Sequence, residues 1–98
     1  MKIFIGNLNR AATAQNIKHL FEPYGEVTAS SILMDRYTAR SRGVGHVEMP
    51  DGAAAETAME ALAHTSFMRQ SINVRPMRSD EESTFGLKAN PTSKINSL

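Results

Sequence analysis

The chain has 98 residues, a length that accommodates one domain at most. Apolar residues make up 41% of it, enough for one modest core, and the formal net charge of +1 means that partners must be inferred from where the charges lie. The absence of cysteine excludes disulfides and thiolate metal sites, and no apolar run approaches the roughly 18 residues of a membrane span.

The first expected element is a short strand, Lys2 to Gly6, rich in β-branched and aromatic residues. Ile3 and Ile5 share one face of it, and Phe4 lies on the other. Phe4 then either points out of the sheet or is buried under a covering segment, and this stretch leaves both interpretations open. No signal-peptide layout precedes the strand, so we expect a soluble, cytoplasmic protein.

A first helix follows, with Thr13 as N-cap and with Pro23 and Gly25 at its end. Its apolar stripe consists of Ile17, Leu20, Phe21 and Tyr24. A weak strand pattern then covers residues 27–34, in which Ser31 and Leu33 share the face of Phe4. Residues 35–41 read as a loop, and this loop carries Arg36 and Arg40.

The most informative stretch is the expected strand from Arg42 to Met49, because its two faces differ in chemistry. Gly45, Val47 and Met49 fall on a small or apolar face at period 2. The opposite face carries Val44, His46 and Glu48. A strand with one core face and one polar face beside basic residues indicates a binding surface.

Asp51 is a suitable N-cap for a second helix over residues 52–63, whose buried stripe contains Ala55, Ala58, Met59 and Leu62. The last strand spans residues 71–78, with Asn73 and Arg75 on its outer face. Residues 79–98 are rich in Ser, Thr, Asn and Lys, and we expect a mostly disordered tail after a domain of residues 1–78. The alternative is a tail that folds back on the domain through Phe85 and Leu87.

The order of elements is therefore strand, helix, strand, strand, helix, strand. This order predicts an α+β, ferredoxin-like βαββαβ fold, in which a four-stranded antiparallel sheet carries two helices on one face.

The chain also resembles the RNA recognition motif family, most of all its short single-domain bacterial form. Residues 3–8, Ile-Phe-Ile-Gly-Asn-Leu, are similar to the first signature of that family, and residues 42–49 are similar to its second. The resemblance covers residues 2 to about 77. Its implication is a single-stranded RNA-binding module, with weaker binding of single-stranded DNA.

The chain departs from the family pattern at several positions. In the family, three aromatic side chains that stack on bases would fall at positions 4, 44 and 46; here they are Phe4, Val44 and His46. Losing one platform and weakening another would cost about one to three powers of ten in affinity, at roughly 1–3 kcal/mol per stack. Ala39, His64 and Arg69 stand where the family usually has glycine in turns, so these loops are either altered in shape or strained.

The resemblance implies roles for the residues on the sheet face. Phe4 and His46 would stack on bases, Val44 would add an apolar contact, and Asn73 would hydrogen-bond to base edges. Phosphates would be contacted by basic side chains that gather near this face: Lys2, Arg36, Arg40, Arg42, Arg75 and Arg78.

Two other function classes compete with RNA binding. Phe4, Leu33 and Val44 could form an apolar patch that binds a peptide or a second copy, although we expect a monomer. The same fold hosts enzymes, but the three histidines fall on different elements and no nucleophile–base pair or phosphate-cradling loop is visible, so we expect no catalysis, no metal and no cofactor.

Overall fold

The computed structural model describes residues 1–85, apart from the side chain of Ser83. In chain order the elements are β1 (Lys2–Gly6), α1 (Ala14–Phe21), the 3-10 turn η1 (Glu22–Tyr24), β2 (Ala29–Met34), β3 (Ser41–Glu48), α2 (Gly52–Leu62), β4 (Ser66–Phe67), β5 (Gln70–Ser71), β6 (Asn73–Pro76) and α3 (Ser79–Thr84).

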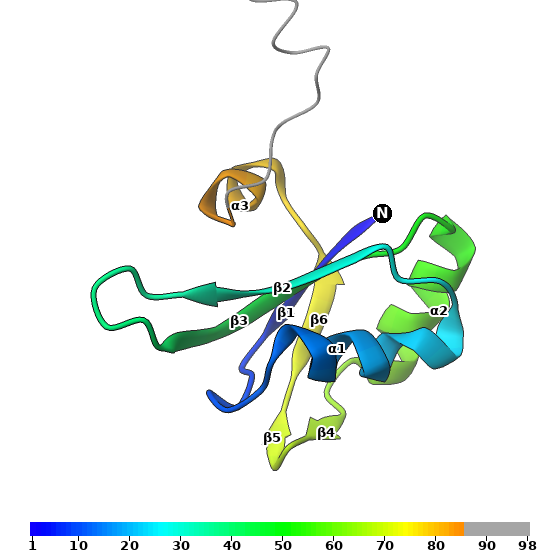
Figure 1. Ribbon diagram of the computed structural model, residues 1–98. Coiled ribbons are helices and arrows are strands. Elements are labelled where there is room, and N and C mark those ends of the chain that lie inside the picture. The colour runs from blue at the N-terminus through cyan, green and yellow to red at the C-terminus, as the bar shows by residue number, and fades with distance from the viewer. Residues whose placement is uncertain (86–98) are drawn as a thin grey trace, which may run out of the picture.

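The central feature is a four-stranded antiparallel sheet in the order β2-β3-β1-β6. Helices α1 and α2 cover one face, and α3 lies on the opposite side of the sheet (Figure 1). This arrangement confirms the expected ferredoxin-like βαββαβ fold. A small hairpin, β4–β5, precedes β6 and was not expected; only its last residue, Ser71, falls in the stretch assigned to the last strand, and β6 begins at Asn73.

The core lies between the sheet and the two long helices. Ile3 and Ile5 of β1 are fully buried against Ile17 and Phe21 of α1, as their spacing predicts. Both helices begin at the expected caps. Thr13 forms a capping box with Asn16, and the Asp51 carboxylate accepts the backbone N–H groups of Ala53 and Ala54; the residues of α2 that face the core are Ala55, Ala58 and Leu62.

The three non-glycine turn residues keep the backbone shape that glycine favours. Ala39, His64 and Arg69 have φ angles of 60°, 61° and 71°, in the left-handed region. Of the two outcomes expected from the sequence, these positive φ angles support strain. Each position carries a cost of about 1–2 kcal/mol.

The expectation of a disordered tail from residue 79 is corrected over its first residues. Ser79–Thr84 form α3, which returns over the outer face of the sheet and brings Phe85 with it. Acidic residues near its N-terminus favour this helix, because they complement the helix dipole. Residues 86–98, including Leu87, lie outside the described residues.

We predict that Gly45→Ala destabilises the protein by about 1–3 kcal/mol, because a core position without free space resists added volume. A Cβ at Gly45 would lie 2.9 Å from the backbone oxygen of Ser31 and 3.1 Å from side-chain carbons of Ile17 and Ile32. Gly52→Ala, in the first turn of α2, meets nothing within 4 Å and is the matched control. Urea unfolding of both variants checks the difference; equal midpoints would contradict the packing argument.

Candidate nucleic-acid interface

Phe4 lies at the centre of the outer sheet face, on the side opposite the buried Ile3 and Ile5. It pairs with His46 on β3 and with Arg75 on β6, so all three side chains project from the same face. The Arg75 guanidinium carbon lies 4.1 Å from the centroid of the Phe4 ring, which is a cation–π geometry. The sheet thus places the Phe4 ring beside the Arg75 guanidinium, and both residues lie on the outer face, where the sequence places them.

His46 is on this outer face and is nevertheless buried, with 2% of its surface exposed. A hydrogen bond of 2.7 Å joins its Nδ1 to the hydroxyl of Ser31, the paired residue on β2. Its Nε2 lies 3.7 Å from a Glu48 carboxylate oxygen, too far for a hydrogen bond, and has no hydrogen-bonding partner among the described residues. Burial lowers the pKa of His46, and the Glu48 carboxylate opposes that shift.

The other end of β3 is open and basic. Arg42 is exposed and Val44 is half-buried. They line a hollow of about 450 Å³ together with Arg10 and Gln70. A neighbouring hollow of about 400 Å³ also contains Arg10 and Arg42, and adds Arg40. Three arginines therefore gather around the start of β3, and we call Arg10, Arg40 and Arg42 the open basic end.

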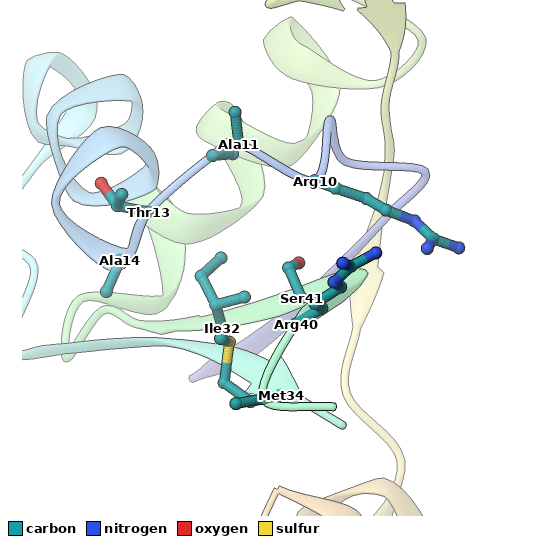
Figure 2. Close-up of a pocket in the computed structure, with 10 residues that line it drawn as sticks. Arg10, Ala11, Thr13, Ala14, Ile32, Met34, Arg40 and Ser41 are labelled. Atoms are coloured by element: carbon teal, nitrogen blue, oxygen red, sulfur yellow. The ribbon is translucent and has the colours of Figure 1, made fainter. Parts of the chain in front are cut away.

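A third hollow, of about 560 Å³, extends from the open basic end along the edge of the sheet. In Figure 2, Arg10 and Arg40 lie at the end of the hollow away from Thr13 and Ala14, and Ile32 and Met34 line its middle. Its lining is thus apolar in the middle and cationic at one end.

The loop between β2 and β3 is ordered by Asp35. Its carboxylate accepts the backbone N–H groups of Tyr37 and Thr38, at 2.8 and 3.0 Å, and these bonds lower the pKa of Asp35. The turn places Arg40 near Arg10 and Arg42, the other members of the open basic end. Arg36 is exposed in the same loop and does not line the hollows around the start of β3.

The remaining expected site residues lie toward β6 and the opposite end of β1. Asn73 is exposed and pairs with Gly6 on the outer face. The Lys2 ammonium lies 3.0 Å from a Glu82 carboxylate oxygen. Arg78 follows β6, and 70% of its side chain is exposed. The structure therefore divides the expected basic residues between the open basic end and the region around α3.

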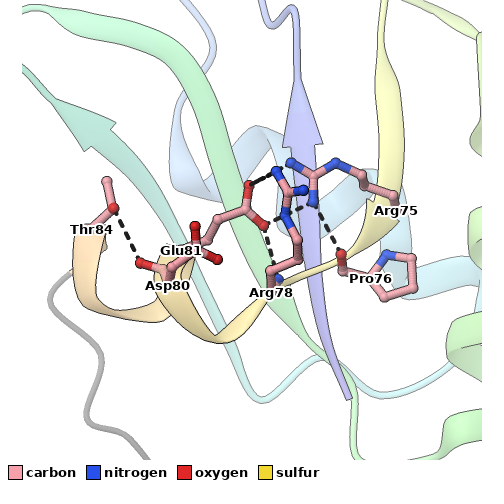
Figure 3. Close-up of polar contacts among 6 residues, drawn as sticks. All are labelled: Arg75, Pro76, Arg78, Asp80, Glu81 and Thr84. Carbon is pink, nitrogen blue, oxygen red and sulfur yellow. Dashed lines mark hydrogen bonds and ion pairs between the residues drawn. The ribbon is translucent and has the colours of Figure 1, made fainter.

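Helix α3 covers the second region. Glu81 accepts two hydrogen bonds from the Arg75 guanidinium and one of 2.9 Å from the backbone N–H of Arg78, and these contacts lower its pKa to about 2, with Arg75 the largest cause (Figure 3). The Phe85 ring centroid is 6.4 Å from that of Phe4, edge to face, and 5.7 Å from that of His46. We call residues 79–85 the C-terminal cover.

Sequence reasoning missed four participants in this surface. Ser31 was placed on the correct face, but its bond to His46 depends on the pairing of β2 with β3. Arg10 lies in a loop after β1, where a period of 2 assigns no face. Glu81 and Glu82 fall in the stretch that the sequence assigns to a disordered tail, although an acidic run, Asp80-Glu81-Glu82, directly after a strand with basic residues is a signal that could have found them.

Two other findings concern function classes. Within residues 1–85 no group of three or more His, Asp or Glu side chains is placed to hold a metal ion. None of the helices in that part of the chain has both the length and the apolar character that crossing a membrane requires.

We predict that the free energy of unfolding falls as the pH drops below about 6.5, the ordinary pKa of histidine. The unfolded chain takes up a proton at His46 there, whereas the folded protein, with a lowered His46 pKa, does not until the pH is lower still. Glu48, Glu82 and Lys2 are the charged groups that act on the ring. Urea unfolding between pH 7.5 and 5.5 should show a smaller loss for His46→Gln than for wild type; equal losses would contradict this.

Comparison with known proteins agrees with the fold. The chain matches the RNA recognition motif over residues 3–73. RbpE of Nostoc sp. is 38% identical over 82 residues, which cover 84% of this chain and 83% of RbpE. The crystal structure of RNA-binding protein PG1 superposes with a TM-score of 0.77 at 38% identity over 79% of this chain and 93% of that one. An SXL-lethal protein–RNA complex gives 0.73 at 29% identity, over 78% of this chain and 47% of its own. This chain belongs to the RNA recognition motif family.

Proposed function

We propose that this protein binds single-stranded RNA across the outer face of its sheet. The observation that carries the proposal is the position of Phe4, at the centre of that face and between the cations of β6 and the open basic end. Related proteins named as RNA-binding, and the SXL-lethal protein–RNA complex of the same fold, support it.

Phe4 stacks on a base in this proposal, and a single base–aromatic stack contributes about 1–3 kcal/mol. Val44 adds an apolar contact on the β3 side, and Asn73 supplies hydrogen bonds to a base edge. His46 stacks only when the C-terminal cover moves, because it is now buried. With one full aromatic platform, base stacking contributes less than in relatives with three, so phosphate contacts have a larger share of the affinity.

Arginine and lysine side chains at both ends of the face contact the phosphates. The open basic end, including Arg10, provides one set, and Arg36 forms an outer rim. Lys2, Arg75 and Arg78 provide the second set on the side of β1 and β6. On the opposite, helix face, Glu56 and Glu60 of α2 are exposed and acidic. The protein therefore has one basic face that attracts phosphate, although its net charge is only +1.

Single-stranded DNA is a weaker ligand in this proposal, and a monomer in the cytoplasm, without catalytic activity, remains the prediction. His19 is on α1, His46 on the outer face of β3 and His64 after α2, an arrangement that does not support a shared catalytic site. The alternative of a protein-binding patch around Phe4, Leu33 and Val44 is an outcome that the RNA experiment tests.

We expect Phe4→Ala to weaken binding of a short, random, fluorescently labelled single-stranded RNA by about tenfold, the loss of roughly one stacking contact. Phe4→Leu should weaken it similarly while keeping an apolar side chain, which separates stacking from folding. Fluorescence anisotropy measures both. Unchanged affinity in a folded variant would contradict the proposal and favour the protein-binding patch.

Binding weakens with salt, so the slope of log affinity against log salt is negative, and we expect Arg42→Gln to make it less negative by about 0.7, the value for one lost phosphate contact with a single strand. Lys18→Gln is the matched control. It removes the same charge from α1, on the helix face, where Lys18 lies 3.9 Å from Glu22. Equal slopes for the two variants would show that binding depends on net charge and not on this face.

A further inference from the structure

The C-terminal cover contacts the same side chains that the proposed function assigns to RNA. Glu81 contacts Arg75, and Glu82 contacts Lys2 at 3.0 Å. Figure 3 shows the guanidinium groups of Arg75 and Arg78 both directed at the Glu81 carboxylate. The Phe85 ring lies against both Phe4 and His46. The two carboxylates of the cover thus pair with cations of the outer face, and its aromatic ring packs on aromatic rings of the same face.

Each of these contacts has the chemistry of an RNA contact. A carboxylate, like a phosphate, offers two anionic oxygens to a guanidinium in a forked geometry. A phenyl ring, like a base, offers a π-system to another ring. Arg75 directs both terminal nitrogens of its guanidinium at Glu81, so a phosphate that bonds to the same edge must displace this carboxylate.

The cover is suited to release, because α3 is too short to be stable by itself. It has six residues, and isolated helices in water are marginal below about 12–15. Ser79, Asp80 and Thr84 are exposed, and the buried apolar core consists entirely of residues between Ile3 and Ile72. The cover can therefore leave the sheet without unfolding the domain.

We propose that residues 79–85 are an autoinhibitory segment that competes with RNA for Lys2, Phe4, His46 and Arg75, and that RNA binds fully only when this segment leaves the sheet. The inference rests on the proposed function. The open basic end stays outside the cover, so RNA first meets Arg10, Arg40 and Arg42 and then displaces the cover from the aromatic half of the face.

The apparent dissociation constant in such a system is the intrinsic value divided by the fraction of open molecules. Loosening the cover therefore tightens RNA binding, and the gain stops once most molecules are open. We expect Glu81→Gln and Phe85→Ala, each in the full chain, to tighten binding of the random RNA by about three- to tenfold. The double variant should gain less than the product of the two single gains.

The two variants separate the proposal from a general charge effect. Glu81→Gln removes one negative charge, and Glu56→Gln removes the same charge from α2 on the helix face as a matched control. Phe85→Ala changes no charge at all. Tightening by Glu81→Gln and Phe85→Ala, with Glu56→Gln close to wild type, supports competition by the cover.

Hydrogen exchange on the wild-type chain gives a readout that does not depend on variants. The backbone N–H groups of Glu81 and Glu82 bond to the carbonyl of Arg78, and that of Phe85 bonds to the carbonyl of Glu81. Saturating RNA should increase exchange at these three amides, whereas amides of β1 should remain protected. Increased protection at residues 81–85 would overturn the proposal, because RNA would then bind with the cover in place.

The titrations distinguish failure of this inference from failure of the proposed function. If wild type binds RNA and Phe4→Ala weakens binding, but Glu81→Gln and Phe85→Ala bind as wild type does, only the autoinhibitory role is overturned. Weaker binding by Phe85→Ala also overturns it, since Phe85 would then belong to the RNA site. If neither wild type nor the loosened variants bind RNA, both inferences fail.

Discussion

The register of β1 between β3 and β6 is the constraint on which the outer face depends. Ile3 and Ile5 must be in the core, and the period-2 alternation of a strand then forces Phe4 to the other side, between His46 and Arg75. A slip of one residue would exchange the two faces. The hydrophobic core that α1 and α2 form with the sheet therefore also positions the residues of the binding surface.

Arg75 takes part in both kinds of contact on the outer face, the aromatic and the ionic. Its guanidinium lies over the ring of Phe4 and bonds to the carboxylate of Glu81, so an aromatic contact and an ion pair share one side chain. Arginine suits this position, because its planar, weakly hydrated group can stack and form a fork of hydrogen bonds at once. The Glu81 carboxylate also accepts the N–H of Arg78 ahead of α3, so the acid that occupies Arg75 helps to begin the helix that carries it.

His46 shows how one substitution changes the character of the face. An aromatic hydrocarbon at this position would form no such bond, whereas the imidazole of His46 bonds to the Ser31 hydroxyl and lies against the Phe85 ring. The buried His46 ring has a hydrogen bond at Nδ1 but none at Nε2 among the described residues. Its pKa depends on burial, which lowers it, and on Glu48, which raises it. The two ends of the face consequently differ. The start of β3 is open and carries the arginines of the open basic end, whereas the region of Phe4 and His46 is aromatic, is covered by residues 79–85 and contains a titratable imidazole.

The sequence by itself determined the order of the six elements of the βαββαβ fold, the two helix caps, the inward isoleucines and the outer-face positions of Phe4 and His46, because these depend on local chemistry and on periods of 2 and 3.6. It left open whether Phe4 is exposed or covered. It also marked Ala39, His64 and Arg69 as turn positions with either altered shape or strain, and the φ angles of the structure favour strain. Only the tertiary structure decided that Arg10 joins Arg40 and Arg42, that Ser31 holds His46, and that residues 79–85 return to the sheet. The reason is physical: α3 is too short and too polar to have a folding signal of its own, and its position depends on contacts with residues distant in the chain. A sequence pattern reports which face a residue occupies, and the pairing of distant strands decides which side chains meet there.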